Sequence, residues 1–115
     1  MSVYNENCPS RKVLEIISNK WVILIIDLLS EKTYRYLELK REIEGISQKI
    51  LTQTLRRLEV CGFVQRREYQ TLPLKVEYSL TQLGRSLSKI FARITVWSEK
   101  NIDAINQAQK GFDTP

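Results

Sequence analysis

The chain of 115 residues contains no histidine and only two cysteines, Cys8 and Cys61. Histidine is the commonest general base and the commonest transition-metal ligand in proteins, and two cysteines cannot complete a structural zinc site without other ligands. The two cysteines do not form a CxxC pair, so a thiol enzyme using Cys8 would lack the groups that normally support such catalysis. We therefore expect no thiol-enzyme activity and no structural zinc site.

Long apolar runs are also missing. The longest, from Trp21 to Ile26, is far shorter than the roughly 20 residues that a membrane-spanning helix needs. The N-terminal sequence MSVYNENCPS lacks the basic and then apolar order of a secretory signal. These absences predict a cytoplasmic protein without a membrane partner, in which thiols are kept reduced.

The composition is otherwise that of an ordinary globular domain, with 43% hydrophobic and 27% charged residues. The length suits one domain with a modest core. Lys and Arg total 18 against 13 Asp and Glu, which gives a formal net charge of +5. This basic excess is compatible with a polyanionic partner without proving one.

The stretch from Ser47 to Cys61, reading SQKILTQTLRRLEVC, has the clearest pattern. Leu51, Leu55 and Leu58 recur at helical spacing and predict one apolar stripe, with Ser47 as the N-cap. The opposite face carries side chains that suit base edges and phosphates: Gln48, Lys49, Thr52, Gln53, Arg56 and Arg57. Taken alone, such a helix is more often a solvated surface helix, so the flanking sequence decides its interpretation.

Two helices are predicted ahead of this stretch, over residues 8–19 and 20–29. The first opens at Cys8-Pro9-Ser10, where proline suits the first helical turn. Its expected inner face consists of Val13, Leu14, Ile16 and Ile17. The second is apolar nearly all round and should lie at the centre of the fold. Its β-branched residues would also allow a buried strand, but its length favours a helix.

A further short helix is predicted from its apolar residues, which are Tyr36, Leu37, Leu39, Ile43 and Ile46. It follows a strand of one or two residues at Thr33 and Tyr34. Glu44-Gly45 then makes a turn into the stretch that begins at Ser47. A short helix, a glycine-containing turn and a longer helix with polar side chains outward make a helix-turn-helix. In that arrangement the second helix enters the major groove.

After Gly62, a predicted left-handed cap, the period of the apolar residues changes to two. Residues 63–69 and 75–80 are predicted strands joined by a loop of about five residues. This basic hairpin completes a winged helix, and its Arg66, Arg67 and Lys75 are expected to contact phosphates. A charged hairpin on its own is more often a solubilised sheet edge, but here it directly follows a basic-faced helix.

Thr81 is the predicted N-cap of a last helix that runs to about Gln109, followed by a tail over 111–115. A helix of this length in a small domain has apolar surface left over, and a second copy of the chain can bury it. The alternative is one broad stripe folded onto its own core. The expected dimer-interface residues are Ile90, Ile94, Trp97, Ile102 and Ile105.

The predicted fold class is therefore mainly α with a small β-hairpin (α+β), a winged helix-turn-helix with an N-terminal helix and a long C-terminal dimerisation helix. We expect a single domain over residues 1–115. Its DNA-binding core would span about residues 10–80, and the dimerisation helix about 81–109.

Several short motifs follow one another along the chain: Cys8-Pro9, Lys20-Trp21, GISQK at 45–49, Leu51-Thr52, Leu55-Arg56, VEYSLT at 76–81 and Leu83-Gly84. In this order they resemble the HxlR-type transcriptional regulators, small bacterial winged-helix proteins, and the combination of GISQK with VEYSLT is specific. The likeness runs from about Cys8 to Trp97. It implies a homodimer that binds double-stranded DNA at a pseudo-palindromic operator, without enzymatic activity or an obligatory cofactor.

The resemblance also implies a role for Cys8, because a cysteine in this position senses oxidants or electrophiles in several members. A thiol at a helix start, with Arg11 and Lys12 in the next turn, favours the reactive thiolate. The alternative is an inert cysteine. Cys61 is expected to be a packed core thiol, although members commonly have a polar or acidic residue there. The wing also departs from the family in having Leu74 where a second proline is frequent.

Two alternatives to a redox-controlled DNA-binding regulator stay open at this point. A small-molecule effector could lie between the core and the terminal helix. A winged helix can also serve protein contacts alone, and it would then show no salt-dependent binding to duplex DNA.

Overall fold

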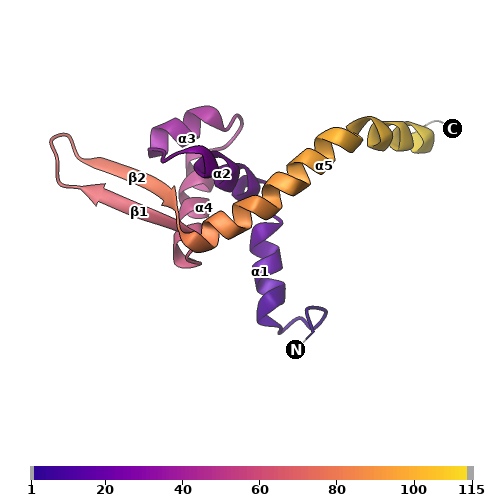
Figure 1. Cartoon of the computed structure of the whole chain (residues 1–115), viewed down its shortest axis with the longest axis horizontal. Helices are drawn as coiled ribbons and strands as arrows, with labels where there is room; N and C mark the ends of the chain where they lie inside the picture. The colour runs from indigo at the N-terminus through magenta and orange to yellow at the C-terminus, as the bar shows by residue number, and fades with distance from the viewer. Residues whose placement is uncertain (1, 114–115) are drawn as a thin grey trace.

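The structure, a computed structural model, describes residues 2–113. In chain order its elements are α1 (Pro9–Ile17), α2 (Lys20–Glu31), α3 (Tyr36–Glu42), α4 (Gln48–Val60), β1 (Val64–Tyr69), β2 (Lys75–Leu80) and α5 (Gln82–Asp113). Three parts project from a small central body: α1, the β1–β2 hairpin and the distal half of α5 (Figure 1). The predicted fold class, mainly helical with one hairpin, is confirmed.

Helix α2 lies at the centre, as its apolar sequence predicts. It contacts α1, α4, α5 and β2. The side chain of Asn19 caps its start by accepting a hydrogen bond from the backbone N–H of Trp21 at 2.8 Å. The buried residues of α2 are Val22, Ile25, Ile26 and Leu29. Only one side of the helix, around Leu24, is exposed within this chain.

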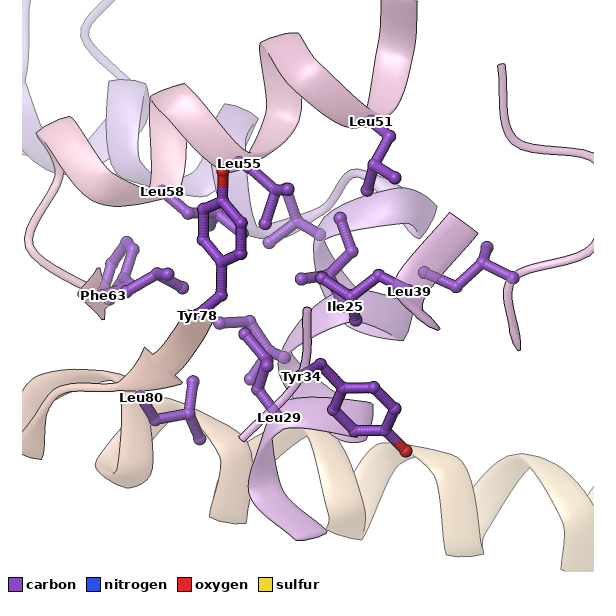
Figure 2. Close-up of a cluster of buried hydrophobic side chains, with 14 of the residues drawn as sticks. Ile25, Leu29, Tyr34, Leu39, Leu51, Leu55, Leu58, Phe63, Tyr78 and Leu80 are labelled. Atoms are coloured by element: carbon purple, nitrogen blue, oxygen red, sulfur yellow. The ribbon is translucent and has the colours of Figure 1, made fainter. Parts of the chain in front are cut away.

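Helix α4 packs onto α2 through the predicted stripe of Leu51, Leu55 and Leu58, all of which are buried (Figure 2). Each fully buried leucine contributes about 1.5–3 kcal/mol relative to an exposed one. The predicted N-cap is confirmed, because the Ser47 hydroxyl oxygen accepts from the backbone N–H of Ile50 at 3.1 Å. These two features fix how α4 is rotated about its axis.

The turn of the helix-turn-helix differs from the prediction in length. Helix α3 ends at Glu42 instead of Ile46, since Ile43 has extended backbone angles. Ile43 and Ile46 are nevertheless buried, and Gly45 turns the chain between them with a φ of 87°. Apolar residues outside a helix extended the helical periodicity past its real end.

The hairpin is antiparallel and runs from the pair Val64↔Leu80 to the pair Tyr69↔Lys75. It is joined to α4 at Gly62, whose φ of 79° confirms the predicted left-handed cap. The backbone N–H of Phe63 then bonds to the carbonyl of Leu58 at 2.9 Å and closes the end of α4.

The short strand predicted at Thr33 and Tyr34 is also confirmed, as an isolated antiparallel β-bridge between Tyr34 and Tyr78. The N–H of Tyr34 donates to the carbonyl of Tyr78 at 3.1 Å, and the N–H of Tyr78 donates back at 2.8 Å. This bridge ties the segment before the helix-turn-helix to the second strand of the wing.

Helix α5 begins directly against the end of α4. The N–H of Thr81 bonds to the carbonyl of Phe63 at 3.1 Å, and its hydroxyl donates to the carbonyl of Gly62. The same hydroxyl oxygen caps the helix by accepting from the N–H of Gly84 at 3.1 Å, as predicted. Leu87 and Phe91 then cover the core.

Two predictions about the terminal helices are wrong. Helix α5 runs to Asp113, so neither its expected end near Gln109 nor the expected tail from Gly111 holds, and residues 114–115 lie outside the described part. The expected inner face of α1 is not buried: Val13 and Leu14 are 46% and 49% exposed, while Ile16 and Ile17 pack only partly against the core.

No helix within residues 2–113 combines the length and the hydrophobicity that crossing a bilayer requires.

The close packing of the start of α5 against Phe63 predicts how two glycine substitutions change stability. A Cβ added at Gly84 would collide with the backbone carbonyl of Phe63, whereas one added at Gly111 would meet nothing within 4 Å. We expect Gly84→Ala to lower the free energy of unfolding by about 1–3 kcal/mol through overpacking. The matched Gly111→Ala should raise it by up to about 1 kcal/mol, because alanine favours a helix.

Urea unfolding at one fixed protein concentration measures both changes. Equal stability of the two variants would contradict the packing of α5 described above.

Candidate nucleic-acid interface

The outer face of α4 carries every residue that the sequence assigned to it. All are exposed: Ser47, Gln48, Lys49, Thr52, Gln53, Arg56 and Arg57. No acidic side chain precedes Glu59 in this helix. The buried leucines hold the opposite side, so this face points away from the body and presents donors and positive charge.

These residues do not form one group but divide between two flanks of α4. On one flank, Gln53 and Arg57 line a hollow of about 490 Å³ together with Asn19 and Trp21 at the start of α2. On the other flank, Thr52 and Arg56 line a hollow of about 340 Å³ that also includes Arg66 of the wing. The two hollows place cations on both sides of the helix, and one of them joins α4 to the hairpin.

Tyr36 belongs to this surface, although the sequence placed it on the apolar face of α3. Its hydroxyl donates to the backbone carbonyl of Gln48 at 3.0 Å and lies 2.9 Å from the hydroxyl of Thr52. A partly buried tyrosine normally finds a polar partner for its hydroxyl, and that rule was the available signal. The identity of the partner depends on how α3 and α4 cross.

The register of the hairpin separates the three predicted wing cations. Residues that oppose each other across two strands share a face of the sheet. Arg66 opposes Tyr78, whereas Arg67 opposes Glu77 and Lys75 opposes Tyr69. Arg66 therefore lies on the face toward α4, and Arg67 and Lys75 lie on the other face.

Acidic neighbours that the sequence analysis passed over partly neutralise the wing. Arg66 lies 3.7 Å from Glu68, and Lys75 lies 2.8 Å from Glu77. The hydrogen bond from Lys75 is the main reason that the pKa of the Glu77 carboxyl is below its usual value. Solvent screens ion pairs at the surface, so a phosphate can replace these carboxylates at little cost.

Arg67 and Lys75 also lie over the ring of Tyr69, 5.2 Å and 5.0 Å from its centroid. Such cation–π contacts at exposed sites contribute about 0.5–1 kcal/mol. The outer face of the wing therefore holds its two cations around one aromatic ring.

Cys8 lies at the start of α1, as predicted, but its side chain is buried and only 2% exposed. It lies outside the main hydrophobic cluster. The N-terminal turn curls back at this point: the N–H of Cys8 bonds to the carbonyl of Asn5 at 3.0 Å, and the Arg11 side chain donates to the carbonyl of Tyr4 at 3.1 Å. Within residues 2–113 neither cysteine forms a disulfide, and Cys61 is half-buried against the core.

The apolar residues expected at a dimer interface are exposed in the single chain: Ile90, Ile94, Trp97, Ile102 and Ile105. Ile90 and Ile94 line a groove of about 880 Å³ together with Leu14 and Ile17 of α1. The distal half of α5 projects away from the body (Figure 1). One apolar surface thus continues from α1 onto the distal part of α5.

Comparison with known proteins identifies relatives of the whole arrangement. The family model for the HxlR-like helix-turn-helix matches residues 16–106. The HTH-type transcriptional regulator YtfH of Escherichia coli K12 is 41% identical over 104 residues, which cover 90% of this chain and 82% of that protein.

Two solved structures have the same fold. YtfH from Salmonella typhimurium, designated a transcriptional regulator, superimposes with a TM-score of 0.88 at 38% identity over 95% of this chain and 97% of that one. The redox regulator HypR in its oxidised form superimposes with a TM-score of 0.76 at 38% identity over 82% and 97%. The chain belongs to the HxlR-like helix-turn-helix family of transcriptional regulators.

Proposed function

We propose that this regulator binds double-stranded DNA as a homodimer at a pseudo-palindromic operator, and that oxidation or electrophilic modification of Cys8 controls the binding. The observation that carries the proposal is the exposed face of α4, which has no acidic side chain before Glu59 and whose back is held by buried leucines. The proposed site of action is the cytoplasm, and the proposed role involves no catalysis and no cofactor.

The groups on α4 suit base edges and phosphates at once. Arginine and glutamine can make two hydrogen bonds to one base, and each such pair is worth about 1–3 kcal/mol of discrimination. We assign base contacts to Gln48, Lys49, Thr52, Gln53 and Arg56. Phosphate contacts fall to Arg57, Arg66, Arg67 and Lys75, and the Ser47 end of the helix lies beside the backbone.

The homodimer follows from the apolar surface of α5 and α1, which a second copy would cover. Two-fold symmetry would then present two α4 helices to two half-sites. Consecutive major grooves on one side of B-DNA are about 34–36 Å apart, so the pairing of the α5 helices would set whether both α4 helices fit at once.

Control by Cys8 rests on its position between α1 and the N-terminal turn. Because the side chain is buried, an oxidant reaches it when the N-terminal turn opens. Formation of a disulfide with a cysteine of the partner subunit would draw the two α1 helices together and change the spacing of the two α4 helices. The similarity to HypR, a redox regulator, supports this assignment.

A second candidate concerns the effector alone. The groove between α1 and α5, at about 880 Å³, falls in the range of small-molecule pockets, about 300–1,000 Å³. An apolar ligand seated there would act on the same α1–α5 arrangement without a covalent change at Cys8.

The dimer is tested by charge insertion. Trp97 is 59% exposed on α5, and Leu72 is fully exposed on the hairpin loop. We expect Trp97→Glu to give a monomer in light scattering, because two carboxylates would be buried in the interface. The matched Leu72→Glu should remain a dimer. A dimeric Trp97→Glu would contradict the proposed interface.

The division between base and phosphate contacts is tested by salt titration of duplex binding. The specific duplex is a fragment of the DNA upstream of the regulator's own gene. Arg66→Ala should weaken binding to this specific fragment and to a random duplex equally. It should also reduce the slope of log affinity against log salt by about 0.9. Arg56→Ala should lose about 1–3 kcal/mol more on the specific fragment than on the random one.

Lys89→Ala, which removes one cation from α5, serves as the control and should change neither affinity. If Arg66→Ala affected only the specific fragment, its assignment to the phosphate backbone would be wrong.

Thiol control is tested with diamide, which takes two electrons and two protons from a pair of thiols as they form a disulfide. The unmodified protein should release its DNA in a gel-shift assay and form a covalent dimer on a non-reducing gel. Cys8→Ser should do neither, while Cys61→Ser should respond like the unmodified protein. Release of DNA by oxidised Cys8→Ser would refute control through Cys8.

A further inference from the structure

The hydrogen bonds of Tyr36 have a consequence for Thr52. Tyr36 is the first residue of α3, and its ring packs partly against the core. Its hydroxyl oxygen lies 3.0 Å from the backbone carbonyl of Gln48 and 2.9 Å from the hydroxyl of Thr52. One phenol thus holds both a backbone group and a side chain on the outer face of α4.

Counting protons fixes the direction of both bonds. A tyrosine hydroxyl has one proton, and a backbone carbonyl can only accept. The Tyr36 proton therefore goes to Gln48. The bond between the two hydroxyls then requires Thr52 to donate its own proton to the oxygen of Tyr36.

Thr52 is left with lone pairs and no free proton. In an ordinary helix a threonine hydroxyl rotates freely or donates to the carbonyl four residues earlier, which here is Gln48. In this structure the Thr52 hydroxyl is held by Tyr36 instead. Thr52 remains exposed and lines the hollow beside Arg56 and Arg66. A base that reaches its hydroxyl there meets an oxygen that can only accept.

We infer that Tyr36 is a positioning residue that makes Thr52 a selector of bases that present an amino group in the major groove. This role rests on the proposed binding of α4 in that groove. In that groove adenine and cytosine present an amino donor, whereas guanine and thymine present carbonyl acceptors. A Thr52 hydroxyl that can only accept would bond to the amino group of adenine or cytosine. It would be repelled by the carbonyl oxygen of guanine or thymine. A threonine free to rotate could bond to either kind.

The size of the effect follows from one hydrogen bond. A net contribution of about 0.5–1.5 kcal/mol corresponds to about two- to tenfold in affinity at one base position. The inference therefore concerns a single position in each half-site, not the overall strength of binding.

The test is selection of duplexes from a random pool by the unmodified protein and by Tyr36→Phe, Thr52→Val and the double variant. The unmodified protein should favour adenine or cytosine at one position of each half-site. Tyr36→Phe frees the Thr52 proton and should reduce that preference by about two- to tenfold, with the other positions unchanged. Thr52→Val should abolish the preference at the same position, and the double variant should match it.

Tyr4→Phe removes a phenol hydroxyl from an exposed N-terminal residue and should leave the selected sequences unchanged. Circular dichroism confirms that each variant is folded.

Four outcomes would overturn the inference. Tyr36→Phe could weaken all sequences by one factor or shift the preference at many positions, and either result would make Tyr36 a structural brace alone. A preference that survives Thr52→Val would show that Thr52 does not contact a base. If the folded unmodified protein enriched no sequence at all, the proposed function itself would fail, and the inference with it.

Discussion

The burial of Leu51, Leu55 and Leu58 against α2 is the constraint on which the rest of the molecule depends. Once this side of α4 is committed to the core, the helical period forces Gln48, Thr52 and Arg56 outward. Two fixed ends reinforce the rotation: the Ser47 cap at the start and the glycine-closed turn at Gly62. The position of the outer face is therefore a consequence of packing. The side chains on that face are not constrained by the core.

Helix α2 also connects the two halves of the proposed mechanism. It contacts α4, and it also contacts α1 and α5. Thr81 adds a second connection, because its hydrogen bonds fasten the start of α5 to the residues that end α4. A change in how α1 and α5 pair with another subunit would consequently move α4 as part of a rigid body. Regulation at the N-terminus and binding at α4 then need no flexible linker.

Much of this arrangement could be predicted because it follows from local rules. The caps at Ser47 and Thr81, the glycine at position 62 and the change of period at the hairpin are each determined by neighbouring residues. Periodicity also identified the side of α4 that faces the core. It could not tell what covers an apolar face, so α1 was given an inner face whose Val13 and Leu14 are exposed within this chain. A helical glycine costs only about 1 kcal/mol, and α5 continues through Gly111.

The features that sequence reasoning missed depend on pairs of distant residues. The bond between Tyr36 and Thr52 joins residues of two helices, and the separation of Arg66 from Arg67 follows from strand register. Likewise, the burial of Cys8 depends on how the N-terminal turn folds back. Such contacts require the relative placement of elements, which residue types and spacing do not contain.

The claim that the outer face of α4 binds DNA is tested most directly by a nuclear magnetic resonance titration. The isotope-labelled protein is titrated with a short random-sequence DNA duplex. Backbone amide shifts should change in α4 and in the hairpin, and they should stay constant in the distal half of α5. Shifts confined to α1 and α5, or an outer face of α4 that does not respond to duplex, would contradict the account.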